Sequence, residues 1–307
     1  MPWAQCTMLT IRDILAAHGP CIGSELLRLV DLKVLSLWRA CCLELDIVMH
    51  RVSQRYLRLD RAVEGYARLS PSIRREFLNY TAVGLVSQVD DITARSLELQ
   101  QEFVRVSQLK RELARDTVQR LVESSPNRER LRAHVCYMIA GDVMYNMADT
   151  FERPESSTGR LVRGSDLDLV IVSDNGLAAE EQEELDELMY REKWHMLVLP
   201  QFREEIDYVV KDVAKVKAQL RFDSLEHMIA SKILQESELL YGSADLFSHI
   251  KWLVRQSGVP DRLRQMEDKA IREREAAEKQ LVMEPEPRHT QAWRHLFFTD
   301  AAWEEIG

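Results

Sequence analysis

The sequence predicts an α+β protein, because helix-like and strand-like patterns alternate along its 307 residues. A polar segment from Asp90 to Glu123 repeats its apolar residues at helical spacing, which is typical of one long helix. After residue 130, short apolar runs alternate with helical segments, as in a sheet covered by helices. These patterns divide the chain into an N-terminal domain, a connecting helix, a second domain and a C-terminal helical region, at 1–85, 86–126, 127–242 and 243–307.

The composition is that of a globular protein, with 46% hydrophobic and 30% charged residues. No run approaches the roughly 18 apolar residues that span a bilayer, and the first residues lack the basic and apolar regions of a signal peptide. The five cysteines include no Cys-x-x-Cys pair, so neither a zinc site nor a disulfide framework is indicated. We therefore expect a cytoplasmic protein with free thiols and no membrane partner.

The N-terminal domain is expected to contain helices followed by a β-hairpin. The helices are predicted over Thr10–His18, from a cap at Ser24 to Val30, and over Leu32–Leu43. The hairpin is predicted to join 47–52 to 55–60 across Ser53 and Gln54. This layout resembles a winged helix-turn-helix domain, which implies a third helix in the major groove of DNA and a wing on the phosphates.

The charge distribution fits an anionic partner for this winged-helix-like domain. Residues 1–80 carry eleven basic and eight acidic side chains, a net of +3, whereas the whole chain has a net charge of −9. The candidate nucleic-acid contacts are Arg51, Arg55 and Arg58. Two alternatives stay open at this point: a solvated arginine face, and a domain that docks a protein or dimerises.

Two aspartates at the start of an apolar run are the main candidates for chemistry. Asp166 and Asp168 stand two residues apart, a spacing that places both on one face of a strand. Like charges on one face repel unless a cation lies between them, and oxygen ligands suit Mg²⁺. A third acid, Asp207, lies in a later strand-like segment, as a two-metal site requires. The alternative is a loop-to-strand junction whose acids are solvated.

A strand that ends at Gly141, followed by Asp166-x-Asp168 and then Asp207, resembles the polymerase-β-type nucleotidyltransferase superfamily. The segment 225–242 is similar to the helix that follows the catalytic sheet in small bacterial nucleotidyltransferases, including those that modify aminoglycosides. The resemblance covers roughly residues 130–250 and implies a mixed sheet flanked by helices. It also implies that Asp166, Asp168 and Asp207 are catalytic and bind two Mg²⁺ ions, and that Asp207 acts or assists as general base.

The same resemblance implies the nucleotide-binding residues Gly141, Asp142, Ser165 and Lys232. Two features depart from the family pattern. Asp142 occupies a position where the family has serine or glycine, and a long insertion at 149–163, from which Arg160 or Arg163 could return to the phosphates, separates Gly141 from Asp166. For Lys232, a solvated lysine on a helix is the alternative interpretation.

These expectations converge on a Mg²⁺-dependent enzyme that transfers a nucleoside monophosphate from a nucleoside triphosphate to a hydroxyl, with release of pyrophosphate. The acceptor is a small molecule, a protein or an RNA, and the sequence leaves that choice open. The alternative function is a DNA-binding transcriptional regulator whose nucleotidyltransferase-like domain senses a nucleotide and is catalytically inactive. Expected partners are the triphosphate, the acceptor and, through the N-terminal domain, DNA; a homodimer is compatible with the sequence.

Overall fold

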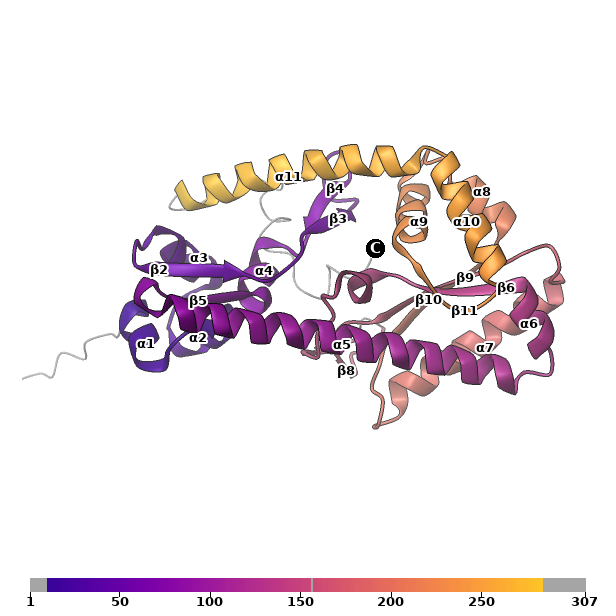
Figure 1. Cartoon of the computed structure of the whole chain (residues 1–307), viewed down its shortest axis with the longest axis horizontal. Coiled ribbons are helices and arrows are strands. Elements are labelled where there is room, and N and C mark those ends of the chain that lie inside the picture. The colour runs from indigo at the N-terminus through magenta and orange to yellow at the C-terminus, as the bar shows by residue number, and fades with distance from the viewer. Residues whose placement is uncertain (1–9, 156, 284–307) are drawn as a thin grey trace, which may run out of the picture. The chain divides into compact units, whose positions relative to one another are not determined.

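The structure, a computed structural model, describes residues 10–155 and 157–283 (Figure 1). The linker expected at 283–287 and the aromatic tail at 291–303 fall, apart from Met283, outside these residues. The fold is α+β, and the chain forms two compact units. Of the described residues, unit 1 contains 10–58, 68–102 and 269–283, and unit 2 contains the rest.

Unit 1 is built on a three-stranded antiparallel sheet with the order β1-β5-β2. Its elements are α1 (Ile11–His18), β1 (Cys21–Ile22), α2 (Gly23–Leu29), α3 (Val34–Leu43), β2 (Ile47–Arg51), α4 (Ile73–Tyr80) and β5 (Thr81–Leu85). Thr10 caps α1 as expected, because its hydroxyl accepts the Asp13 N–H while the Asp13 carboxylate accepts the Thr10 N–H. Helix α2 begins at Gly23, so the expected cap at Ser24 is wrong.

The hairpin predicted for residues 47–60 is also wrong. Strand β2 pairs with β5, while β3 (Tyr56–Leu59) pairs with β4 (Ala67–Ser70). Every residue of β5 is buried, and this strand pairs on both sides, with β1 and with β2. The segment 61–85 was expected to be a connector with a helix that starts near Pro71; it contains that helix, α4, and also supplies the strands β4 and β5. Local alternation identified β3 as a strand but could not identify its partner.

Unit 2 contains a four-stranded mixed sheet with the order β10-β9-β6-β11. The strands are β6 (Val135–Ile139), β9 (Leu167–Ser173), β10 (Ile206–Asp212) and β11 (Glu238–Gly242). Strands β9 and β10 are parallel, whereas β6 is antiparallel to both β9 and β11. The helical elements are α6 (Arg128–His134), the 3₁₀ turn η2 (Gly141–Tyr145), α7 (Ala179–Val198), α8 (Val213–Gln219), α9 (Leu225–Glu236) and α10 (Ala244–Gln256).

The predicted long helix forms as α5 (Val89–Ser124), preceded by the 3₁₀ turn η1 (Val86–Gln88), and the C-terminal helix α11 spans Val259–Met283. In unit 2, α5 and α7 pack on one face of the sheet, where their apolar residues join the core with those of β6, β9 and β10. Helices α9 and α10 lie on the other side of this sheet (Figure 1). No helix in the described part of the chain is both long and apolar enough to cross a membrane.

Two further expectations for unit 2 are corrected. The insertion at 149–163 contains a β-hairpin, β7 (Glu152–Pro154) with β8 (Leu161–Arg163), where an irregular segment was expected. The helix expected over 225–242 ends at Glu236, and its last residues form β11 instead. A short apolar run does not distinguish a strand from a helix by its periodicity.

Candidate functional site

Two adjacent parallel strands bring three acidic side chains together in unit 2. The register of β9 against β10 places Asp207 opposite Asp168, and Asp166 immediately precedes β9. One carboxylate oxygen from each of these residues lies within 4.8 Å of the other two. Asp207 is far from the other two in the sequence, so its place beside them depends on the pairing of β9 with β10.

Burial and mutual repulsion raise the pKa of two of these carboxyl groups. Burial is the main cause for Asp166, whose pKa rises to about 6; Arg153 opposes this shift, and the charges of Asp207 and Asp142 add to it. The pKa of Asp168 lies well above its ordinary value because of burial and the charges of Asp166 and Asp207. Both carboxyl groups therefore favour either a proton or a neighbouring cation.

Gly141 lets the backbone approach the Asp168 carboxylate. Its φ of +72° lies in the left-handed region, and a Cβ built there would stand 1.9 Å from Oδ2 of Asp168. The backbone N–H of Ala140, the preceding residue, donates to the Asp168 carbonyl at 2.9 Å. No other residue fits at position 141 without displacing the Asp168 side chain.

An arginine that sequence reasoning missed lies beside this cluster. Arg153, on β7, forms an ion pair of 2.8 Å with Glu205 and lies 3.9 Å from Oδ2 of Asp166. The Glu205 pKa rises to about 7 through burial, against the opposing charge of Arg153. Arg160 and Arg163 of the same insertion were the arginines that the sequence analysis named as able to return to the phosphates. Nothing in the local sequence pattern distinguishes Arg153 from them, although its partner Glu205 stands in the same strand-like segment as Asp207.

A lysine from α7 already contacts the third carboxylate. The Lys193 ammonium lies 2.8 Å from Oδ1 of Asp207, whose side chain is 46% exposed. Sequence reasoning missed Lys193 as well, because no local pattern indicates that this residue faces Asp207. Two of the three carboxylates thus have a positive charge beside them: Arg153 lies beside Asp166, and Lys193 lies beside Asp207.

The residues implied to bind the nucleotide are close to the cluster but engaged with other groups. Lys232 forms an ion pair with Glu236, which also accepts the Tyr145 hydroxyl at 2.5 Å and the Gly141 N–H at 3.5 Å. The Lys232 ammonium also lies 5.6 Å from the centre of the Tyr145 ring. Both charged side chains of this pair are largely buried, so Lys232 is not the solvated helix lysine of the alternative interpretation.

Ser165 and Asp142 form a second contact at the edge of the cluster. The Ser165 hydroxyl, in a residue only 1% exposed, donates to Oδ2 of Asp142 at 3.4 Å and accepts the Asp149 N–H at 3.2 Å. The negative charge of Asp142 raises the pKa of both Asp166 and Asp168. Asp142 therefore acts electrostatically as a fourth acid of the cluster.

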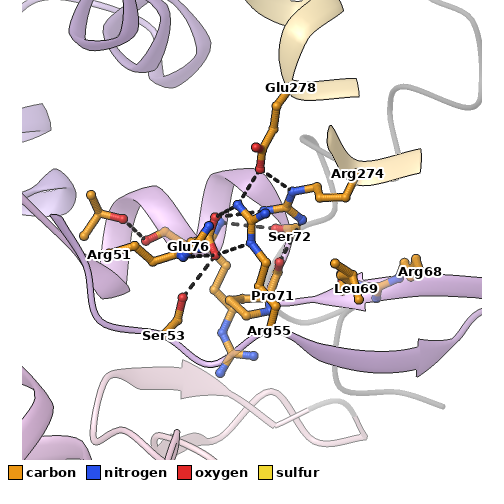
Figure 2. Close-up of polar contacts among 12 residues, drawn as sticks. Arg51, Ser53, Arg55, Arg68, Leu69, Pro71, Ser72, Glu76, Arg274 and Glu278 are labelled. Carbon is orange, nitrogen blue, oxygen red and sulfur yellow. Dashed lines mark hydrogen bonds and ion pairs between the residues drawn. The ribbon is translucent and has the colours of Figure 1, made fainter. Parts of the chain in front are cut away.

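The three arginines proposed as nucleic-acid contacts lie in unit 1, at the end of β2, just before β3 and within β3. Arg55 donates to both carboxylate oxygens of Glu76, at 2.9 and 2.7 Å, and contacts Glu278 at 2.5 Å (Figure 2). Arg51 lies 3.6 Å from Glu76 and its side chain is 45% exposed. Arg58 is partly buried on β3. Arg55 is therefore held inside the protein by acidic partners, while Arg51 remains accessible.

The donor set of the carboxylate cluster fits a divalent cation. Three carboxylate oxygens within 4.8 Å of one another are hard ligands of the kind that Mg²⁺ prefers. Burial and the charges of neighbouring acids raise the pKa of Asp166 and of Asp168, so a bound cation would favour the ionised form of both groups. Among the described residues, this is the group of acidic, histidine and cysteine side chains that could hold a metal ion.

Comparison with known proteins gives no further assignment. No family model matches the chain, and no curated protein matches its sequence.

Proposed function

We propose that this chain is a Mg²⁺-dependent nucleotidyltransferase that moves a nucleoside monophosphate from a nucleoside triphosphate to a hydroxyl acceptor. The observation that carries the proposal is the meeting of Asp166, Asp168 and Asp207 within 4.8 Å. When bound at these residues, two Mg²⁺ ions supply charge neutralisation for the triphosphate and activation of the acceptor oxygen. The finer fold proposal is a nucleotidyltransferase sheet in unit 2, supported by its mixed strand order.

The chain's own residues contribute positioning and proton transfer to this reaction. The pairing of β9 with β10 sets the positions of Asp168 and Asp207. Gly141 has no Cβ, and this leaves room for the Asp168 carboxylate. The Asp207 side chain is 46% exposed, so it is placed to accept the acceptor's proton. Arg153 supplies a fixed positive charge beside Asp166 that offsets repulsion between the acids.

The position of the Asp142 carboxylate beside the cluster favours the alternative function, a DNA-binding regulator. Its charge acts on Asp166 and Asp168 and would also repel the phosphates of a bound triphosphate, which disfavours turnover. The strand order β1-β5-β2, together with the helices α1, α2 and α3 that precede β2, supports a winged-helix-like unit 1, as a DNA-binding regulator needs. Arg55 argues against this alternative, because its ion pairs with Glu76 and Glu278 occupy a side chain that was expected to contact DNA.

The experiment that separates these functions measures turnover. The protein is incubated with Mg²⁺ and each α-labelled triphosphate in turn, with RNA, aminoglycosides or the protein itself as acceptor, and pyrophosphate release is followed. We expect label transfer that disappears in Asp166→Ala/Asp168→Ala. If no triphosphate gives transfer that depends on these residues, the enzyme proposal fails. Nucleotide binding without turnover, together with salt-dependent binding of duplex DNA, would support the regulator.

A further inference from the structure

Unit 1 contains a cavity that the proposed function does not use. Its volume is about 480 Å³, within the range of small-molecule sites. All of its lining residues belong to unit 1. The apolar lining consists of Trp38, Cys42, Met49, Ile73, Phe77, Val282 and Met283. The charged lining consists of Arg51, Arg55, Glu76, Glu278 and Lys279.

The apolar wall belongs to the core of unit 1. Trp38 is 7% exposed, Ile73 is 1% exposed and Phe77 is 2% exposed, so these side chains have few alternative positions. They come from α3 and α4, which pack in the same apolar cluster. A rigid aromatic wall lowers the entropic cost of binding a flat apolar group. The wall therefore suits the apolar body of a small molecule.

The charged wall is a network of ion pairs (Figure 2). Arg274 is fully buried and donates to Glu76 at 3.1 Å, to Glu278 at 2.8 Å and to the Pro71 carbonyl at 3.0 Å. Arg55 contacts the same two glutamates, and the Ser53 hydroxyl donates to Glu76 at 3.0 Å. These buried contacts fix the positions of both glutamates.

Both carboxylates are already well supplied with donors. Burial by itself would raise the pKa of Glu76, but the hydrogen bonds from Arg55 and the charges of Arg274, Arg55 and Arg51 lower it. Glu76 is therefore ionised and strongly held. A further cation near this network gains little from Glu76, because its oxygens already accept from Arg55, Arg274 and Ser53.

The network has an excess of positive charge at the cavity. Four cations, Arg51, Arg55, Arg274 and Lys279, face two carboxylates. Arg51 has the longest of the ion pairs to Glu76, at 3.6 Å, and its side chain is 45% exposed. Lys279 lines the cavity without an ion pair to any residue that the structure describes. An anion in the cavity would give both cations a partner.

We propose that this cavity binds a small organic acid with an apolar body and one carboxylate group. The carboxylate pairs with Arg51 and Lys279, and the body packs against Trp38 and Phe77. A planar guanidinium matches a carboxylate with two parallel hydrogen bonds, which favours an organic acid over a neutral molecule of the same shape. The proposal does not depend on the activity of the carboxylate cluster in unit 2.

The test compares a charged ligand with its neutral counterpart on the full-length protein. Calorimetry measures the binding of 1-naphthaleneacetate and of 1-naphthaleneacetamide, which share an aromatic body and differ in charge. We expect the acid to bind at least about tenfold more tightly than the amide, because a hydrogen bond to a charged group contributes more than a neutral one. Added salt should weaken binding of the acid and leave binding of the amide nearly unchanged.

Two double variants locate the site. Arg51→Met/Lys279→Met should lower the affinity for the acid until it is about equal to the affinity for the amide. Arg28→Met/Arg272→Met removes two exposed basic residues outside the cavity lining and should change neither affinity. Circular dichroism checks that each variant is folded. If Arg51→Met/Lys279→Met does not fold, the single variant Lys279→Met replaces an exposed residue and can be used in its place. It should weaken binding of the acid and leave binding of the amide unchanged.

Three results would overturn the proposal. The first is that the acid does not bind the wild-type protein. The second is that acid and amide bind with equal affinity. The third is that the loss of Lys279, alone or with Arg51, leaves the preference for the acid intact. None of these results bears on nucleotidyl transfer, since Asp166 and Asp168 are unchanged in every variant.

Discussion

Asp168→Asn should make the metal-free protein more stable, although it removes a group proposed to be catalytic. Two unit charges at 4.8 Å repel by about 3.5 kcal/mol at an effective dielectric constant of about 20. The real gain is smaller, because Asp207 is 46% exposed and water screens its charge. Proton uptake by Asp168, whose pKa is raised, relieves part of the repulsion as well. We expect a gain of about 1–3 kcal/mol in the free energy of unfolding.

The assay follows urea unfolding of both proteins at about pH 8, where carboxyl groups are more fully ionised, first with a chelator and then with Mg²⁺. Mg²⁺ should stabilise the wild type, because it binds the folded state, and should stabilise Asp168→Asn much less. Asp116→Asn, which removes an exposed acid of α5, should change stability by no more than about 0.5 kcal/mol in either condition. A variant less stable than the wild type in chelator would refute the repulsion argument. A wild type that does not respond to Mg²⁺ would refute the metal site.

Three further predictions test the neighbours of the cluster and the ion-pair network of unit 1. Gly141→Ala and Gly159→Ala both place a side chain at positive φ, which should lower the stability of each variant by about 1–2 kcal/mol. Only the new Cβ of Gly141→Ala meets Asp168, so only this variant should lose Mg²⁺ binding, measured by calorimetry. Lys193→Met should strengthen Mg²⁺ binding about fivefold, a gain of roughly 1 kcal/mol, because it removes a cation 2.8 Å from a proposed ligand. Unchanged or weaker binding would contradict this. The lowered pKa of Glu76 means that its stabilisation is present above the ordinary carboxyl pKa and is lost as the pH falls through the folded value. Glu76→Gln should therefore lower the free energy of unfolding by about 3–5 kcal/mol at neutral pH and make stability depend less on pH in the acid range. Hydrogen exchange of residues 73–85 measures both effects. Equal exchange in the two proteins would contradict the prediction.

Much of the secondary structure was predictable because it depends on local spacing. Helical periodicity and a capping residue predicted α1 from Thr10 to His18, and the long polar repeat predicted α5. The apolar run after Asp166 predicted β9. Errors arose where short segments fit either structure, as for β11, or where the partner of a strand lay far away, as for β2. Local pattern does not contain that information.

The candidate site was predictable only in part, for the same reason. The spacing of Asp166 and Asp168 indicated a shared face, and Asp207 was singled out by its strand and by the family resemblance. That one carboxylate oxygen of each lies within 4.8 Å of the others became known only from the parallel pairing of β9 and β10. No pattern indicated Arg153, because its position depends on the path of the β7–β8 hairpin.

The sequence by itself determined the α+β composition, the long helices and the acidic residues that stand at the front of β9 and in β10. The tertiary structure decided which strands pair, which cations lie beside Asp166 and Asp207, and that Arg55 is held by Glu76 and Glu278. The physical reason is the range of the interactions. Helical and strand periodicity acts over a few residues, whereas charge pairing and burial depend on groups that the fold brings together from distant parts of the chain.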